Sequence, residues 1–112
     1  MIRTALILAT LTLAACTPQT PQEKQADQLR DEAAARAESV MAEAGNVTAG
    51  MESQAEALMN EAGQMGTYEA KRLQVRADAL KREAAVVTDQ AEAKARAIKA
   101  EGEAKASAVL AQ

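Results

Sequence analysis

Residues 73–109 read LQVRADALKREAAVVTDQAEAKARAIKAEGEAKASAV, and this stretch decides the fold. Small or aliphatic residues recur in it at steps of three and four: Leu73, Ala77, Leu80, Ala84, Val87, Ala91, Ala95, Ile98, Gly102, Ala106 and Val109. Such steps place all of them on one face of an α-helix. The alternation of alanine with charged residues does not favour a strand, because both are poor strand formers. The pattern predicts one long helix over residues 68–111.

The preceding segment repeats the pattern and predicts a second helical arm over residues 23–62. Its stripes are Leu29, Ala33, Ala37, Val40 and Ala44, and then Met51, Ala55, Leu58, Ala62 and Met65. Residues 63–67 contain two glycines, each costing about 1 kcal/mol inside a helix relative to alanine, and we expect the turn there. Residues 45–50 also contain two glycines, so a break in the first arm stays open. Ser53 with Glu56 would form a capping box after such a break, and Thr67 would cap the last helix.

Composition favours an elongated protein over a compact globule. The chain has 112 residues, with no Phe, Trp or His, and Tyr68 is its only aromatic residue. Alanine dominates the predicted contact faces, and it buries little area, so each helical turn gains only modestly from packing. The expected fold class is all-α, with long Ala-rich amphipathic helices forming an extended helical hairpin or coiled coil.

The two arms differ in charge. Residues 23–64 carry mostly acidic side chains, whereas basic side chains outnumber acidic ones from residue 67 onward. Opposite net charge favours pairing of the arms, within one chain or between chains. Exposed ion pairs contribute only about 0–1 kcal/mol each, so this charge selects a partner more than it stabilises a fold.

No arrangement of residues in the sequence suggests catalysis. Histidine is absent and Cys16 is the only cysteine, which removes the usual nucleophile–base pairs and soft metal sites. Met41, Met51, Met59 and Met65 are better explained as adaptable packing residues than as metal ligands. We expect no enzyme activity, no cofactor or metal, no small-molecule substrate and no nucleic-acid partner.

One basic cluster is a candidate contact for an anionic surface. It consists of Lys71, Arg72, Arg76, Lys81 and Arg82. It could contact anionic lipid, polysaccharide or peptidoglycan. Interleaved acidic residues such as Glu69, Asp78 and Glu83 favour the plainer interpretation, a helix surface with many ion pairs.

The N-terminal segment has the layout of a secretory signal. A short positive start, Met1-Ile2-Arg3, is followed by an apolar run over residues 5–13 and by Leu13-Ala14-Ala15-Cys16. Those last four residues resemble the lipobox of bacterial lipoproteins. The resemblance implies a signal peptide over residues 1–15, cleavage before Cys16, and lipid on the Cys16 sulfur and amino group. Residues 16–22, which include Pro18 and Pro21, would then form a lipidated tether.

Two alternatives for this segment remain. It could be an uncleaved transmembrane anchor, although its apolar run has only about half of the roughly 20 residues a spanning helix needs. It could also be an ordinary signal peptide followed by a free cysteine. By resemblance to lipoproteins of enteric bacteria, Thr17 after the cysteine favours the outer membrane, whereas aspartate there favours the inner membrane.

Two further resemblances concern the helices. A lipid-modified N-terminus followed by an Ala-rich rod is similar in layout to Braun's murein lipoprotein, a family of helical trimers attached to peptidoglycan through a C-terminal lysine. The last lysine here is Lys105, so that attachment is not expected. Residues 91–106 resemble the coiled-coil tail of the stomatin/prohibitin/flotillin proteins, whose globular domain has no counterpart here. Ala/Glu/Lys helices recur by composition alone, so the likeness is treated as convergent.

Together these features predict a small bacterial lipoprotein, anchored in the outer membrane and facing the periplasm. It would have a structural or interaction role through an Ala-rich coiled coil, with itself or with an envelope protein as partner. Two rivals remain: a stress-protective, hydrophilin-like lipoprotein that is disordered until dehydrated, and an accessory subunit of an envelope complex.

Overall fold

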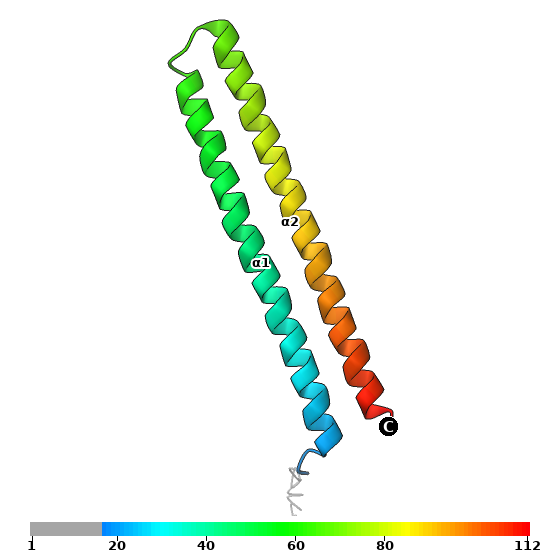
Figure 1. Ribbon diagram of the computed structural model, residues 1–112. Coiled ribbons are helices and arrows are strands. Elements are labelled where there is room, and N and C mark those ends of the chain that lie inside the picture. The colour runs from blue at the N-terminus through cyan, green and yellow to red at the C-terminus, as the bar shows by residue number, and fades with distance from the viewer. Residues whose placement is uncertain (1–16) are drawn as a thin grey trace, which may run out of the picture.

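The computed structural model describes residues 17–112, and these form an antiparallel hairpin of two helices (Figure 1). Helix α1 spans Pro21–Ala62 and helix α2 spans Thr67–Leu110. Their 42 and 44 residues correspond to lengths of about 63 and 66 Å at 1.5 Å per residue. The expected all-α, extended architecture is therefore confirmed. The signal segment and Cys16 lie outside the described residues.

The hairpin core is a line of alanines with larger side chains at its edges. Within residues 17–112 the buried apolar residues are all alanine: Ala26, Ala33, Ala37, Ala44, Ala55, Ala62, Ala77, Ala84, Ala91, Ala95 and Ala106. Gly102 is buried on the same face of α2. The larger aliphatic residues of the predicted stripes, such as Leu29, Leu80 and Ile98, are only partly buried beside this line. Small residues at the contact let the two backbones approach closely, which replaces the aromatic core that the sequence lacks.

The two helices approach each other closely at Gly102. A methyl group built on Gly102 would overlap the Ala33 side chain and would lie 3.3 Å from the Leu29 carbonyl oxygen. Glycine is therefore required here by space and not by backbone conformation, since no described glycine has a positive φ.

Helix α1 begins with a capping box that the sequence analysis did not identify. The Glu23 backbone N–H donates to Thr20 Oγ1 at 3.2 Å, and the Thr20 N–H donates to Glu23 Oε2 at 2.6 Å. Pro21 occupies the first helical turn, where a missing N–H costs nothing. Two residues of the expected tether, Pro21 and Gln22, therefore belong to the helix.

The structure shows no break at residues 45–50. Helix α1 continues through Gly45 and Gly50, with Thr48 Oγ1 donating to the Gly45 carbonyl oxygen at 3.1 Å. Ala44 and Ala55 are buried on either side, three helical turns apart, and only an unbroken helix keeps both in the contact line. Packing along α2 thus outweighs the glycine cost of about 1 kcal/mol each. The capping box expected at Ser53 and Glu56 is wrong for the same reason.

The turn occupies residues 63–66. Gly63 caps the end of α1, and its N–H donates to the Met59 carbonyl oxygen at 3.2 Å. Gly66 is the N-terminal cap of α2, and no side chain completes that cap. The cap expected from Thr67 is wrong, because Thr67 is the first residue inside the helix and no side chain forms a cap hydrogen bond there.

Candidate functional site

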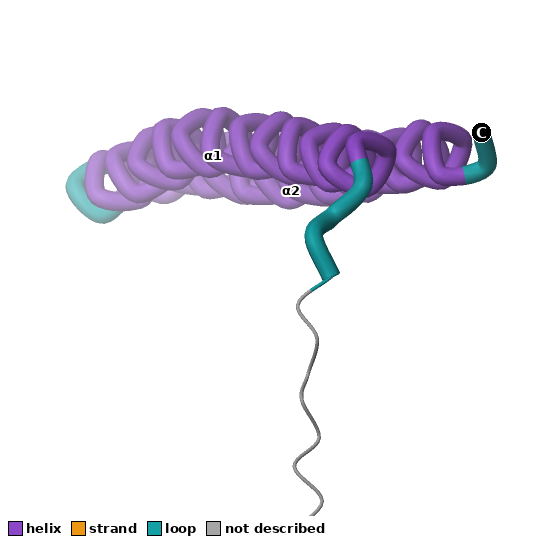
Figure 2. Tube along the Cα trace, turned by 90° about the horizontal axis from the view of Figure 1, so that it is seen from below, coloured by secondary structure: helices purple, strands orange, loops and turns teal. Residues whose placement is uncertain are grey.

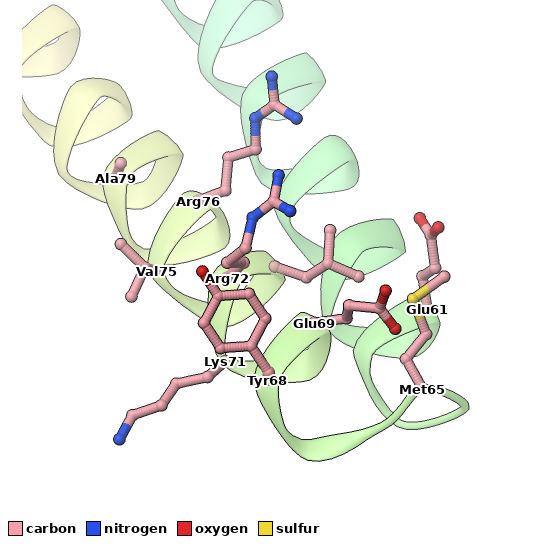
Figure 3. Close-up of a pocket in the computed structure, with 10 residues that line it drawn as sticks. Glu61, Met65, Tyr68, Glu69, Lys71, Arg72, Val75, Arg76 and Ala79 are labelled. Carbon is pink, nitrogen blue, oxygen red and sulfur yellow. The ribbon is translucent and has the colours of Figure 1, made fainter.

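The surface around the turn, which we call the tip, carries a shallow, open groove. It is lined by Glu61 and Met65 from the end of α1 and the turn, and by residues of α2: Tyr68, Glu69, Lys71, Arg72, Leu73, Val75, Arg76 and Ala79. Figure 3 shows the groove and the side chains that line it. A second depression, lined by Leu58, Leu80 and Glu83 among others, shares Glu61, Arg76 and Ala79 with it. The two form one open furrow along the end of the hairpin.

Arg72 and Arg76 are four residues apart and therefore share one face of α2. In Figure 3 their guanidinium groups lie one above the other and reach toward α1. Glu61 of α1 lines the same groove, but none of the ion pairs of residues 17–112 joins it to these arginines.

Apolar groups lie beside these charges. Tyr68 is 78% exposed, and Met65 and Val75 are also exposed large apolar residues. A phenol, a thioether and two guanidinium groups together suit a surface that is both anionic and partly apolar. Arginine forms bidentate contacts with carboxylates and phosphates, and tyrosine places an apolar ring with a polar end at such a boundary.

The structure divides the predicted basic cluster. Lys71, Arg72 and Arg76 line the tip groove, whereas Lys81 and Arg82 lie outside both depressions. Lys81 follows Arg72 by nine residues, or two and a half helical turns, and so it projects from the opposite side of α2. The five residues therefore do not form one basic face. Sequence reasoning missed the contribution of Tyr68 and Met65, although their closeness to the predicted turn was a usable signal.

The charge pattern reverses at the other end of the hairpin. There Arg30 of α1 donates to Glu103 of α2 through Nε at 2.8 Å and Nη2 at 3.0 Å. Among residues 17–112 this is the salt bridge that joins the two helices; the others lie within one helix. The cation comes from the acidic arm and the anion from the basic arm, so net charge did not predict this contact.

Hydrogen bonding shifts the ionisation of these groups. The bond with Glu103 raises the pKa of Arg30, and the bond from Arg30 lowers the pKa of Glu103. One turn away, a hydrogen bond from Lys105 lowers the pKa of Glu101, helped by the positive charge of Arg36 on α1. In both pairs a cationic side chain stabilises the ionised form of an exposed carboxylate. Because Glu101 and Glu103 are exposed to solvent, they lack the buried surroundings that catalytic carboxylates usually have.

The described residues contain neither a metal site nor a membrane span. Within residues 17–112 no three His, Cys, Asp or Glu side chains gather so as to hold a metal ion. None of the helices there is both long and apolar enough to cross a bilayer. Comparison with protein-family models, with curated proteins and with solved structures gave no match to this chain.

Proposed function

We propose that this protein is a bacterial lipoprotein whose helical hairpin serves as a structural or interaction element of the cell envelope. The observation that carries the proposal is Leu13-Ala14-Ala15-Cys16 at the end of a signal-like segment, only four residues before the capped start of α1. Lipid on Cys16 would hold the start of α1 at the membrane. The tip would then lie about 65 Å along the hairpin from the anchored end, on the periplasmic side of the membrane.

Anchoring by Cys16 is consistent with the energetics of lipid insertion. Each buried methylene contributes about 0.8 kcal/mol, and one acyl chain alone gives only reversible binding. Two or three chains on Cys16 would anchor the protein durably without a spanning helix. Thr17 favours the outer membrane as the destination, by the resemblance to enteric lipoproteins.

The anchoring proposal is tested by mass spectrometry and fractionation of the full chain expressed in a bacterium with two membranes. We expect the detergent-extracted protein to have lost residues 1–15 and to carry a diacylglyceryl group and an amide-linked acyl chain. Cys16→Ser should abolish this modification, whereas Thr17→Ser is the matched control and should leave it unchanged. The proposal fails if Cys16→Ser stays equally firmly in the membrane with its leader removed as in the parent chain.

Sorting provides a second test. Thr17→Asp should move the protein from the outer to the inner membrane fraction, provided that the host follows the enteric rule. An unchanged distribution in such a host, with lipid still attached, would refute the proposed basis of outer-membrane localisation.

At the tip, we propose contact with an anionic envelope surface through Lys71, Arg72 and Arg76. The groove places two guanidinium groups beside exposed Tyr68 and Met65, which suits a surface with both negative charge and apolar groups. Binding to vesicles containing anionic lipid should fall for the triple change of these three residues to Gln. Lys81→Gln, Lys94→Gln and Lys99→Gln together are the matched control, since they remove the same charge and all three lie outside the groove. Equal loss in both variants would show general charge attraction without a tip site.

The hydrophilin-like rival is favoured by the scarcity of aromatic residues and the high content of charged residues and alanine. Circular dichroism separates the two functions. A packed hairpin should be helical in dilute buffer and unfold with a sigmoidal transition, because its contact line spans both helices. A random-coil spectrum that becomes helical only on drying would favour the rival and remove the structural role.

A further inference from the structure

The side of α2 that faces away from α1 carries the most exposed large apolar residues of the described chain. These are Tyr68, Val75 and Val86, with exposed fractions of 78%, 61% and 52%. Their separations of seven and eleven residues are close to whole numbers of helical turns, so the three lie along one line. Figure 3 shows Val75 and Ala79 pointing away from α1. We call this line the outer face.

The outer face repeats the spacing that α2 uses to pack on α1. The buried small residues of α2 are Ala77, Ala84, Ala91, Ala95, Gly102 and Ala106. Two residues after each of them stand Ala79, Val86, Ala93, Ala97, Ala104 and Ala108, and all six are exposed. Two residues correspond to about 200° around a helix, so the second set faces the opposite direction. Helix α2 therefore has two apolar contact lines of the same spacing, of which α1 covers one.

Charges along one edge of the outer face alternate in sign every seven residues. They are Arg82, Asp89, Arg96 and Glu103. If a second α2 runs antiparallel across this face about a twofold axis near Ala93, Arg82 comes opposite Glu103 and Asp89 opposite Arg96 of the second copy. Each cation meets an anion, and the same pairs recur on both sides of the axis, as an isologous contact requires.

An offset of one residue in the centre of the pairs, about 1.5 Å along the helix, also matches side-chain size on the face itself. It places Val75 opposite Ala108, Ala79 opposite Ala104 and Val86 opposite Ala97 of the second copy. Each valine then meets an alanine, which lets the two helices approach without overlap. A parallel, in-register copy would instead place Val86 beside Val86 and Arg82 beside Arg82, which combines large with large and like charge with like charge.

We propose that the outer face of α2 from Val75 onward is the docking surface of a second copy of this chain, bound antiparallel, in a four-helix assembly with the two α2 helices in its centre. Tyr68 lies beyond the end of the second copy and stays exposed at the tip. This deepens the interaction role proposed above, and rests on it, by naming the partner and the face. Because antiparallel copies carry Cys16 at opposite ends of the assembly, both lipids enter one bilayer with the helices lying along its surface.

Glu103 also binds Arg30 of its own chain at 2.8 Å, whereas Arg96 has only a longer contact of 3.7 Å with Glu92 of its own helix. Asp89 and Arg96 are therefore the pair on which a charge test depends.

Cysteine cross-linking tests the alignment. The full chain carrying Cys16→Ser has no other thiol, so an introduced cysteine is the only one. Ala79→Cys and Ala104→Cys are both at exposed positions, and circular dichroism checks that each variant keeps its helices. Under mild oxidation, a mixture of the two should give the 79–104 disulfide, identified as a linked peptide by mass spectrometry. Neither variant alone should dimerise. Self-linking of each variant would show a parallel dimer, and no linking would show no contact through this face; either result overturns the proposal.

Charge exchange tests the partner's identity independently of thiols. In sedimentation equilibrium, Asp89→Arg and Arg96→Asp should each raise the dimer dissociation constant about tenfold, because each creates two like-charge contacts across the axis. The double exchange restores opposite pairs and should return the constant to near that of the parent. Glu56→Arg on α1 is the matched control and should have no effect. Failure of the double exchange to rescue overturns the antiparallel pairing. These measurements need no membrane, so their failure is distinct from failure of the lipid anchor.

Discussion

Gly102 of α2 lies so close to Ala33 of α1 that no side chain fits between them. Helix–helix contact at this level is set by the absence of a single methyl group. Partly buried Leu29 and Ile98, which line a small cleft with these two residues, close the contact on its sides. Because only glycine fits opposite Ala33, residue 102 helps to fix how α2 is aligned along α1.

We expect Gly102→Ala to destabilise the hairpin. Alanine gains about 1 kcal/mol of helix propensity, but overpacking a close contact costs typically about 1–3 kcal/mol. The added methyl meets the Ala33 side chain on a rigid backbone, so the packing cost should prevail and the melting temperature should fall. Thermal unfolding followed by circular dichroism measures the change, and a higher melting temperature would contradict the close approach.

Gly45→Ala and Gly50→Ala should have the opposite effect. Nothing lies within 4 Å of a side chain added at either glycine, and both are inside α1. Each change should therefore stabilise the protein by about 0.5–1 kcal/mol through helix propensity. If α1 were instead broken at residues 45–50, the same substitutions would change the helix content at low temperature as well as the melting temperature.

Thr20→Ala should weaken the start of α1. The Thr20 hydroxyl accepts the Glu23 N–H, and loss of such a cap typically costs about 1 kcal/mol. Thr20→Ser retains the oxygen and should restore most of the stability. Thr67→Ala is the control at the other helix, because Thr67 supplies no cap, and it should change stability little. An equal loss in both alanine variants would show that the Thr20–Glu23 box does not act as described.

The Arg30–Glu103 pair predicts a dependence of stability on pH. Arg30 lowers the pKa of Glu103 in the folded protein, so this contribution is fully present above the usual glutamate pKa of about 4.3. It is lost as the pH falls through the lowered pKa, where the folded protein takes up the proton. Glu101 acts in the same direction through Lys105. Stability should therefore decrease as the pH is lowered below about 4.3.

Substitution of Arg30 isolates its part of this dependence. Arg30→Gln should flatten the decline in melting temperature at acidic pH, whereas Lys24→Gln should not, since Lys24 takes part in none of the ion pairs of residues 17–112. A decline of the same slope in Arg30→Gln and the parent chain would mean that Glu103 is not stabilised by Arg30.

The arrangement of the helices followed from the spacing of small residues. All six buried positions of α2 belong to the stripe read from residues 73–109, and in α1 only Ala26 was missed. This worked because a period of three and four residues fixes which face is buried, whatever the partner. The turn was also predictable, since Gly63 and Gly66 interrupt strong helix formers.

Local exceptions were less predictable. Gly45 and Gly50 have the same composition signal as the turn, but α1 continues through them because its contact line with α2 extends on both sides. The Thr20–Glu23 box was readable as Thr-Pro-Gln-Glu and was overlooked beside the prolines of the expected tether. The tip groove and the Arg30–Glu103 bond depend on which residues of α1 lie beside which residues of α2. The small-residue pattern of each helix shows which face is buried, but it does not show how the two helices are aligned along their length.

The antiparallel course of α1 and α2 brings the first described residues and Gln112 to the same end of the rod (Figures 1 and 2). A fluorophore or affinity tag fused after Gln112 would therefore report on the neighbourhood of the start of α1, although the two are far apart in sequence. A probe inserted between Gly63 and Gly66 would instead sample the distant end. The distances of the two labels from a bilayer surface, measured separately, would together give the orientation of the hairpin relative to that bilayer.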